Sequence, residues 1–494
     1  MVFADKFILL LAVASALLLS GLGRFALKDY DEATYALVSA EMAESGNYLY
    51  LTHNGNPWLD KPPLLFWLIG ASISVFGFNE FSLRLPGALI GLATVVLTYA
   101  LARSLTGNRN IALLSAGILL ATSQFIYSAR ELRFDVPVGF GILLAVYSFF
   151  RSRQKPLWYI GVGAGLAAAI LFKSIFAVFI PLLILIFSFV YHDWRWLRQP
   201  LFWLSVGGGL LLVLPWHLLQ YRAYGDTFVN TYLGRHGFAR YTDPFLGARN
   251  ASPAYFFVLA GKVVEPWFAL FCFGSLWFIF RRQTKTMRES KLYQPILATL
   301  LSSVAIIGVL SFSKSKLFYY FDPVYPFLAI FIGLMLVFWR EKMTRFSPKT
   351  YALIISLVLL FGLTNTVWQV AEIRGWPRGA GEYALTGEER EVSRILNKQT
   401  ASSKLYTMLH FYWDTIRFYT RDRAVPIEIN ALGETIDADA FFLLIPTVVL
   451  KSIEIHPLIR ELLETVFDGE HLTLFMVRAL EPITNPNPPS QTAR

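Results

Sequence analysis

Two groups of charged side chains follow the first apolar segment of the chain and are the strongest candidates for chemistry. The first is Asp31 and Glu32, which open a helical pattern, and the second is Asp60 and Lys61, which precede a pair of prolines. Charged groups beside membrane segments are costly to desolvate, so they indicate a functional site. A carboxylate there can take a proton from an acceptor, and an ammonium can hold a phosphate as a point charge. The pattern favours chemistry on a lipid-linked substrate that carries phosphate.

The same side chains also have structural interpretations, and these stay open. Asp31 can cap the helix that follows it, and Glu32 can interact with the positive end of the helix dipole. Lys61 can extend its charged end to the lipid headgroups. Capping is compatible with proton transfer at the same carboxylate.

A further acidic residue, Asp135, opens a later apolar segment and follows Arg130-Glu131-Leu132-Arg133. One interpretation is a second acidic group that faces Asp31 across a cavity. The other is a helix cap, with the two arginines as simple ion-pair partners.

Two more polar stretches lie between apolar segments. Loop 219–253 carries His236, which is either a base or ligand or a solvated side chain, and Arg240, a further candidate for phosphate binding. Lys314 and Lys316 stand beside tyrosines, a combination that suits the rim of a phosphate site. Anchoring at the membrane interface is the alternative for this second stretch.

The composition is typical of a polytopic membrane protein. Of the 494 residues, 55% are hydrophobic and 16% are charged, and the mean hydropathy is +0.49. A soluble chain of this length would carry more charge. The net charge of +10 reflects cytoplasmic loops, and the basic runs are short and lack a recognition motif, which argues against nucleic-acid binding. The single cysteine, Cys272, excludes an intrachain disulfide and a cysteine-rich metal site.

Apolar stretches predict about eleven membrane spans, since a span needs roughly 20 residues. They lie near 7–23, 84–102, 111–128, 135–150, 157–172, 174–190, 200–218, 254–280, 295–312, 319–339 and 350–370. The first is expected to be a retained span, because no small-residue cleavage site follows it. Arginine and lysine gather in alternate loops, which are therefore predicted to be cytoplasmic: 103–110, 151–156, 191–199, 281–291 and 340–349.

This orientation places loop 24–83 outside, together with every residue after about 371. Residues 62–78 are apolar throughout, and a span there would invert all later loops. We interpret the segment as a helix in the outer interface, with a true span as the alternative. Only the interfacial interpretation puts Asp31 and Asp135 on the same face of the membrane.

The last part of the chain is more charged. Short apolar runs predict strands at 404–409, 441–445 and 473–477, and helical patterns fit 387–398 and 449–466. The predicted domains are an all-α transmembrane domain over 1–370, a small extracytoplasmic α/β domain over 371–484 and a disordered, proline-rich tail over 485–494.

Taken together, the motifs resemble a known family. The chain reads Asp-Glu-x-x-Tyr over 31–35, Asp-Lys-Pro-Pro-Leu-Leu-x-Trp-Leu over 60–68, Phe-Gly-x-Asn-Glu-Phe-x-x-Arg-Leu-Pro over 76–86 and Ser-Lys-x-Lys-Leu-x-x-Tyr over 313–320. This order is similar to that of the GT-C membrane glycosyltransferases, specifically the bacterial aminoarabinose transferases related to protein O-mannosyltransferases. The resemblance covers about residues 5–340. It implies a multi-pass protein of the bacterial inner membrane whose active site faces the periplasm.

The resemblance also implies roles for single residues. Asp31 matches the catalytic carboxylate of the family, and Asp135 matches its second acidic residue. The lysine and the tyrosine that contact the polyprenyl phosphate correspond to Lys61 and Tyr320. The wider candidate set then comprises Glu32 for catalysis, Tyr35, Lys314, Lys316 and Arg240 for substrate binding, and Asp60 and His236, which match positions that bind a metal in some relatives. Asp60 stands where glutamate is usual, and Thr34 stands where the family has an arginine.

The predicted activity is transfer of a hexose or pentose from a polyprenyl-phosphate donor to a lipid (lipid A-like), glycan or protein acceptor at the outer face of the membrane. The chemistry requires no cofactor, although a divalent metal fits the resemblance. A transporter or flippase of lipid-linked sugars is the alternative from another class. Transporters favour paired halves with similar broken spans, and the chain shows no such symmetry.

Overall fold

A computed structural model describes the chain over residues 2–24, 26–28, 31–242, 254–255, 266–342, 347–372, 391–392, 394–396, 405–407, 413–420, 424–426, 441–446, 463–468 and 472–477. Its contacts divide the chain into two compact units. The first is Met1–Gly23 with Val38–Arg374, and the second is Arg24–Leu37 with Gly375–Arg494. The second unit therefore includes a segment from near the start of the chain, which the sequence alone assigned to the transmembrane domain.

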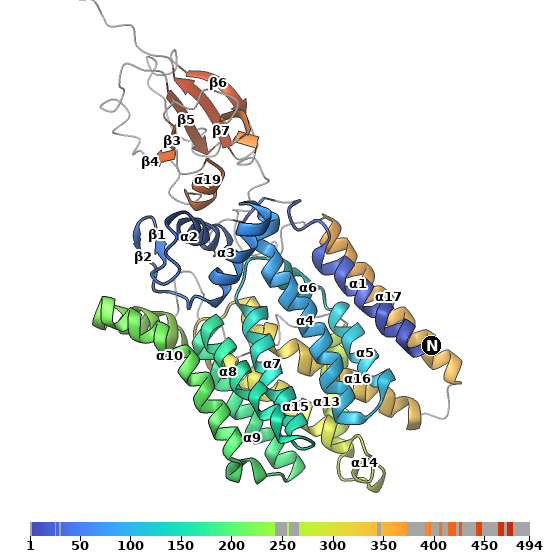
Figure 1. Cartoon of the computed structure of the whole chain (residues 1–494). Coiled ribbons are helices and arrows are strands. Elements are labelled where there is room, and N and C mark those ends of the chain that lie inside the picture. Colours follow the sequence, from blue (N-terminus) through green and yellow to red (C-terminus); the bar gives the residue numbers. More distant parts are fainter. Residues whose placement is uncertain are drawn as a thin grey trace, which may run out of the picture. The chain divides into compact units, whose positions relative to one another are not determined.

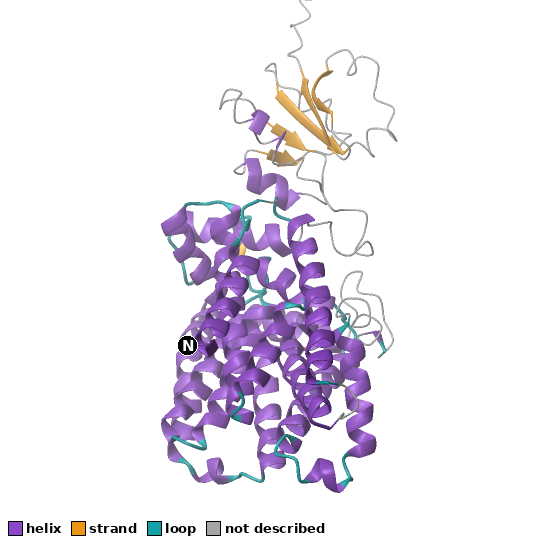
Figure 2. Cartoon of the chain, turned by 90° about the vertical axis from the view of Figure 1, so that its right-hand side faces the viewer, coloured by secondary structure: helices purple, strands orange, loops and turns teal. Residues whose placement is uncertain are grey.

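The first unit is a bundle of helices (Figures 1 and 2). Its first half comprises α1 (Val2–Leu19), α3 (Leu64–Phe76), α4 (Glu80–Thr106), α5 (Arg109–Leu120), α6 (Ser123–Arg130), α7 (Asp135–Ser152), α8 (Tyr159–Lys173) and α9 (Phe179–Tyr191). The second half comprises α10 (Pro200–Phe228), α11 (Ala239–Thr242), α13 (Trp267–Arg281), α14 (Lys285–Arg288), α15 (Tyr293–Phe312), α16 (Tyr325–Lys342) and α17 (Pro348–Glu372). Helix α2 (Asp31–Ser45) begins in the second unit and continues into the first.

Seven helical segments among the described residues are long and apolar enough to cross a membrane, or eight if the bent pair of α5 and α6 counts as one. The predicted spans 157–172 and 174–190 fall within one such segment, Pro156–Tyr191. Of the predicted span at 254–280, only residues 254–255 and 266–280 are described, and α13 (Trp267–Arg281) holds 15 residues. A helix of that length rises about 22 Å, less than the roughly 30 Å of a bilayer core. The polytopic all-α class is confirmed, with fewer spans described than predicted.

The apolar segment at 62–78 forms α3, which has 13 residues. It rises only about 20 Å, so it is too short to cross a bilayer core of roughly 30 Å. Gly77 ends the helix with a positive φ of 74°. This length supports the interpretation of the segment as a helix that does not span.

Small residues let α7 and α8 pack closely. A Cβ added at Gly141 of α7 would lie 2.8 Å from the backbone nitrogen of Ala169, and one added at Gly165 of α8 would lie 2.6 Å from the carbonyl oxygen of Gly141. Small residues at membrane helix contacts allow this approach of two backbones. Because a short connection joins the two helices, they run antiparallel, and the start of α7 meets the end of α8.

The segment that precedes Lys61 is fixed by a tight hairpin. Strands β1 (Thr52–His53) and β2 (Asn56–Pro57) pair around Asn54 and Gly55, which both have positive φ. That backbone favours Asn-Gly in a two-residue hairpin turn. The Glu41 carboxylate accepts hydrogen bonds from Asn54 N at 2.6 Å and from the Thr52 hydroxyl at 2.6 Å.

The same segment is also tied to α10. The carbonyl oxygen of Leu49 accepts hydrogen bonds from Trp216 Nε1 at 3.2 Å and Gln220 Nε2 at 2.7 Å. Leu59 packs in a buried cluster with Trp216 and two aromatic side chains further along the chain, Phe228 and Tyr232. These contacts hold the residues just before Lys61 against α10.

The polar loop predicted over 219–253 is helical as far as it is described. Helix α10 continues to Phe228, a π-helix η4 (Val229–Phe238) follows, and α11 ends at Thr242. The helix breaks only at Gly225, whose φ is 51° and ψ is −132°. The predicted loop is wrong over these residues because their polarity was taken as a sign of a loop, whereas Tyr232 packs against Trp216 and Phe228 of α10.

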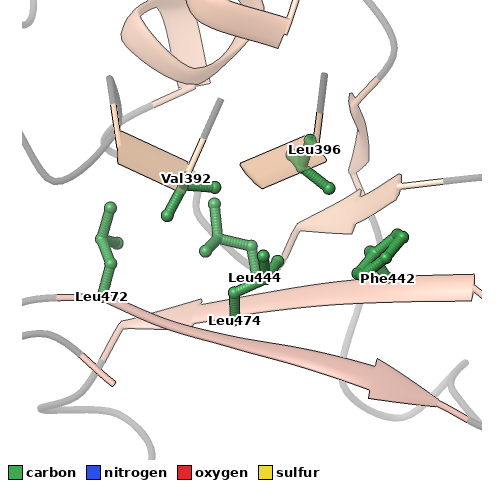
Figure 3. Close-up of a cluster of buried hydrophobic side chains, with 6 residues drawn as sticks. All are labelled: Val392, Leu396, Phe442, Leu444, Leu472 and Leu474. Atoms are coloured by element: carbon green, nitrogen blue, oxygen red, sulfur yellow. The ribbon is translucent and has the colours of Figure 1, made fainter. Parts of the chain in front are cut away.

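The second unit contains a mixed sheet of five strands in the order β4-β3-β5-β7-β6. Its strands are β3 (Leu405–Thr407), β4 (Ala424–Pro426), β5 (Phe441–Pro446), β6 (Leu463–Asp468) and β7 (Leu472–Val477). Strand β3 pairs in parallel with β4 and β5, while β7 pairs antiparallel with β5 and β6. Figure 3 shows its core, in which Val392 and Leu396 pack on side chains of β5 and β7. This sheet confirms the small α/β region near the C-terminus.

Helix α19 (Trp413–Thr420) connects the parallel strands β3 and β4. Parallel neighbours need such a crossover connection. The helix predicted over 449–466 is wrong at its end, where residues from Leu463 form β6. The β-branched residues Thr465 and Val466 favour a strand there, and its pairing with β7 is irregular between Thr465 and Phe467. Residues 449–462 and the predicted tail 485–494 lie outside the described residues.

Candidate functional site

A buried ion pair joins the start of α7 to the end of α8. The Lys173 Nζ atom lies 2.5 Å from Asp135 Oδ1, and the two side chains are 10% and 4% exposed. The antiparallel packing of the two helices brings these residues together. A buried pair is costly to desolvate and is retained only where its geometry satisfies both charges. Asp135 therefore has a specific cationic partner that the sequence argument did not identify.

Aromatic rings surround this lysine. Its Nζ atom lies 4.3 Å from the ring centre of Tyr320 and 4.5 Å from that of Phe176. Tyr320 belongs to the short helix η5 (Phe318–Val324) and is 5% exposed. A cation over the face of a ring gains electrostatic attraction, more so away from water. The predicted residues Asp135 and Tyr320 thus meet around Lys173.

A second buried carboxyl group lies beside the pair. Asp322 is 3% exposed, and neither of its oxygens has a hydrogen-bond partner among the described residues. Asp135, Arg133 and Lys173 are its charged neighbours, and the Ser128 hydroxyl is close without reaching hydrogen-bond geometry. An unsatisfied buried polar group costs folding free energy, and such costs concentrate at functional sites.

Arg133, just before Asp135 in the sequence, is a further cation near the ion pair. Its Nε atom lies 2.5 Å from Glu131 Oε2, and its guanidinium carbon lies 4.3 Å from the ring centre of Tyr319. In the sequence, this arginine was expected only as an ion-pair partner of Asp135. The structure instead pairs Asp135 with Lys173 and Arg133 with Glu131.

The other predicted lysines differ in exposure. Lys61 is 8% exposed, just before the buried prolines that lead into α3. Lys316 is also buried, and its ammonium donates to the carbonyl oxygen of Ser313 at 2.5 Å. Burial lowers the pKa of Lys316. Lys314 is exposed. A buried lysine is not extended to water, so Lys61 and Lys316 differ from simple headgroup anchors.

A chain of hydrogen bonds begins next to the ion pair. The Ser174 hydroxyl donates to Tyr232 Oη at 2.6 Å, and Tyr232 Oη lies 3.0 Å from His217 Nε2. His217 Nδ1 lies 2.9 Å from the carbonyl oxygen of Val213, which can only accept. In the uncharged imidazole the proton is therefore on Nδ1, and Nε2 accepts from Tyr232. His217 was not among the residues predicted from the sequence, where His236 was the candidate histidine.

The first predicted carboxylates lie in the second unit. Asp31 is the first residue of α2, and its Oδ1 atom accepts from the Tyr35 hydroxyl at 3.3 Å. Glu32 is 3% exposed and its Oε2 atom accepts from Lys28 N at 2.8 Å. Glu32 therefore closes the turn that leads into the helix. The predicted approach of Asp31 to Asp135 joins residues of the two units and stays a prediction.

The predicted metal ligands are Asp60 and His236. Asp60 is partly exposed, and His236 lies on η4, where its side chain is outside the description, as is that of Arg240 on α11. Among the described side chains, no group of three or more His, Cys, Asp or Glu residues could hold a metal ion. A metal at Asp60 and His236 stays a prediction.

One signal in the sequence could have identified the missing partner of Asp135. Lys173 interrupts the apolar run that the sequence argument divided into two spans. A charged residue inside a membrane segment indicates function and calls for a partner. Asp322 follows the same rule, since it lies in the predicted span 319–339.

Residues 60–218 match the family model of dolichyl-phosphate-mannose-protein mannosyltransferases. An uncharacterised protein of Aquifex aeolicus is 30% identical over 66% of this chain, which spans 62% of that relative. A Pseudomonas fluorescens protein, undecaprenyl phosphate-alpha-4-amino-4-deoxy-L-arabinose arabinosyl transferase 1, is 25% identical over 72% of this chain and 70% of its own length.

A solved structure has the same fold over most of the chain. The crystal structure of ArnT from Cupriavidus metallidurans bound to undecaprenyl phosphate aligns with a TM-score of 0.69 at 20% identity, covering 95% of this chain and 97% of that one. The chain is therefore a multi-pass membrane protein with the GT-C fold, similar to the aminoarabinose transferases and the protein mannosyltransferases.

Proposed function

We propose that this protein transfers a sugar from a polyprenyl-phosphate donor to a lipid, glycan or protein acceptor at the outer face of the membrane. The observation that supports this most strongly is the buried arrangement of Asp135, Lys173 and Tyr320. Asp135 and Lys173 lie within the stretch that matches the mannosyltransferase family. Relatives with the same fold include an ArnT bound to undecaprenyl phosphate.

The charges suit the departure of a lipid phosphate. In the transfer, the acceptor oxygen forms a bond to the anomeric carbon while the bond from that carbon to the phosphate oxygen breaks. The leaving polyprenyl phosphate gains one negative charge, and the acceptor loses one proton. Fixed cations stabilise charge that develops in the transition state. Lys61 and Lys316 are the buried lysines proposed to take this role.

A carboxylate must receive the acceptor's proton, and we assign this to Asp31. Its Tyr35 partner holds one oxygen at 3.3 Å. Asp135 already pairs with Lys173, so its negative charge is engaged in the ion pair. We therefore assign Asp135 the role of holding the Lys173 ammonium in place. Asp31 is the base of the proposed reaction.

The test is turnover of a radiolabelled polyprenyl-phosphate sugar by the purified protein in detergent. Asp31→Asn keeps the shape of the side chain and removes the charge that a base needs. Loss of a general base costs about two to four orders of magnitude in rate. A matched carboxylate-to-amide change at Asp226, which is exposed, is expected to leave the rate within about twofold.

The competing outcomes are distinct. Transfer by Asp31→Asn within a few-fold of the unaltered protein would remove Asp31 as the base. If vesicles that contain the protein move the labelled lipid between leaflets without releasing its sugar to any acceptor, the protein is a flippase instead.

A further inference from the structure

The segment that carries Asp31 is held by a helix of the C-terminal domain. Residues 24–37 and the C-terminal domain form one compact unit, although more than three hundred residues separate them in sequence. Two hydrogen bonds join them. Leu27 N donates to Tyr419 Oη at 2.8 Å, and the Thr34 hydroxyl donates to Asp414 Oδ2 at 2.5 Å.

These two contacts lie on either side of Asp31. Leu27 precedes it by four residues in the turn before α2, and Thr34 follows it by three residues in the first turn of the helix. Between them, Ala33 N donates to the Lys28 carbonyl oxygen at 3.0 Å. Both partners on the other side come from α19, so one short helix holds the backbone before Asp31 and the side chain after it.

Helix α19 is well supported for such a role. It lies in sequence between the parallel strands β3 and β4, and it contacts β4. Thr415, Phe418 and Tyr419 are buried, and the rings of Phe418 and Tyr419 are in edge contact with centres 4.9 Å apart. Functional groups placed on elements that packing holds fixed are positioned more accurately than groups on free loops.

We propose that α19 is the positioning element for Asp31, with Asp414 and Tyr419 as its positioning residues. Thr34 takes part in this positioning, because its hydroxyl donates a hydrogen bond to Asp414. The C-terminal domain thereby sets the orientation of the carboxylate toward the acceptor. This inference rests on the proposed function of Asp31 as the base.

The experiment combines transfer kinetics with hydrogen exchange of the full-length protein. Tyr419→Phe removes the oxygen that accepts from Leu27, and Asp414→Ala removes the acceptor of Thr34. Both are expected to lower kcat about ten- to a hundredfold, because small displacements of a catalytic group have effects of this size. The KM for the polyprenyl-phosphate donor is expected to stay unchanged. Hydrogen exchange in the peptide covering 24–37 is expected to speed up.

Conservative and control variants separate positioning from folding. Asp414→Asn keeps an acceptor oxygen and is expected to recover most of the kcat that Asp414→Ala loses. Thr34→Val is expected to match Asp414→Ala, and the two together are expected to lose no more than either alone. Glu391→Ala breaks an exposed ion pair with Arg394 in the same unit and serves as the control, with unchanged kcat and exchange.

Failure of the inference differs from failure of the proposed function. If Asp31→Asn abolishes transfer while Asp414→Ala and Tyr419→Phe keep the unaltered kcat, α19 does not position the base. A rise in donor KM with unchanged kcat also overturns the inference. If Asp31→Asn itself transfers sugar normally, the proposed function of Asp31 fails first, and the inference fails with it.

Discussion

The structural role of the ion pair between Asp135 and Lys173 can be separated from its functional role by single and double substitutions. Lys173→Met and Asp135→Asn each leave one buried charge without its partner. Breaking a buried pair in this way costs about 3–5 kcal/mol. The side chains are only 10% and 4% exposed, so the upper part of this range applies. At about 2–4 °C per kcal/mol, a loss of about 4–5 kcal/mol is expected to lower the Tm of each single variant by roughly 8 to 20 °C.

Combining the two substitutions removes both charges, and neutral side chains in place of a buried pair are often no less stable. The double variant is therefore expected to regain a Tm within a few degrees of the unaltered protein. Its transfer rate is expected to stay about a hundredfold or more below normal, because the charged groups that order the site are absent. Recovered stability without recovered transfer is the signature of a functional pair.

The single cysteine makes the stability measurement direct. Cys272 lies half-buried in α13, so a dye that becomes fluorescent on reaction with a thiol reports unfolding as the sample is heated. Transfer is measured well below the lowest Tm of the set. Full recovery of transfer in the double variant would refute a functional role of the pair, and an unchanged Tm in both single variants would refute the burial argument.

The remaining predictions concern binding, topology and pH. Lys61→Ala is expected to weaken donor affinity about ten- to a hundredfold, and Lys61→Arg is expected to weaken it less. The measurement is a titration of the donor at a fixed acceptor concentration. An unchanged titration curve for Lys61→Ala would show that this lysine only anchors the chain at the headgroups. In a cysteine-free background, cysteines at Ser45 and Lys314 are expected to react with an impermeant thiol reagent from outside, and one at Thr286 is not; labelling of the last from outside would invert the topology. The side-chain hydrogen bond from Arg195 lowers the pKa of Asp193 to about 2, so its contribution to stability is present above its unfolded pKa near 3.8 and is lost as the pH falls through 2. Asp193→Asn is expected to lower the Tm at pH 7 and to change it less at pH 3, whereas an equal loss at both values would show that charge is not involved.

The sequence predicted well what depends on composition and local pattern. The apolar runs and the charged tail identified the membrane helices and the small sheet region, because hydropathy and alternation are local properties. Strand β5 begins at Phe441 as predicted. The sequence predicted poorly those segments whose secondary structure depends on tertiary packing. The residues after Leu218 were expected to form a loop, yet they are helical because Phe228 and Tyr232 pack against Trp216.

The candidate site shows the same limit. Tyr320 is recognisable in sequence from its motif, and Asp135 as an acidic residue that opens an apolar segment. The partner Lys173 is 38 residues from Asp135, and only the packing of α7 on α8 brings them together. Likewise, no local pattern connects Thr34 to Asp414, which is 380 residues away. Pairings of this kind depend on the fold, which a single sequence does not display.

The close backbone contact of Gly141 and Gly165 affects how the protein responds to its bilayer. Bilayers differ in thickness, and membrane helices adjust to this mismatch chiefly by tilting. Two helices whose backbones meet without intervening side chains cannot slide past one another, because a shift of either would drive backbone atoms together. They tilt as a pair instead. The separation of Asp135 and Lys173 is therefore expected to be the same in thin and thick membranes, so the charge centre keeps its geometry when the lipid composition changes.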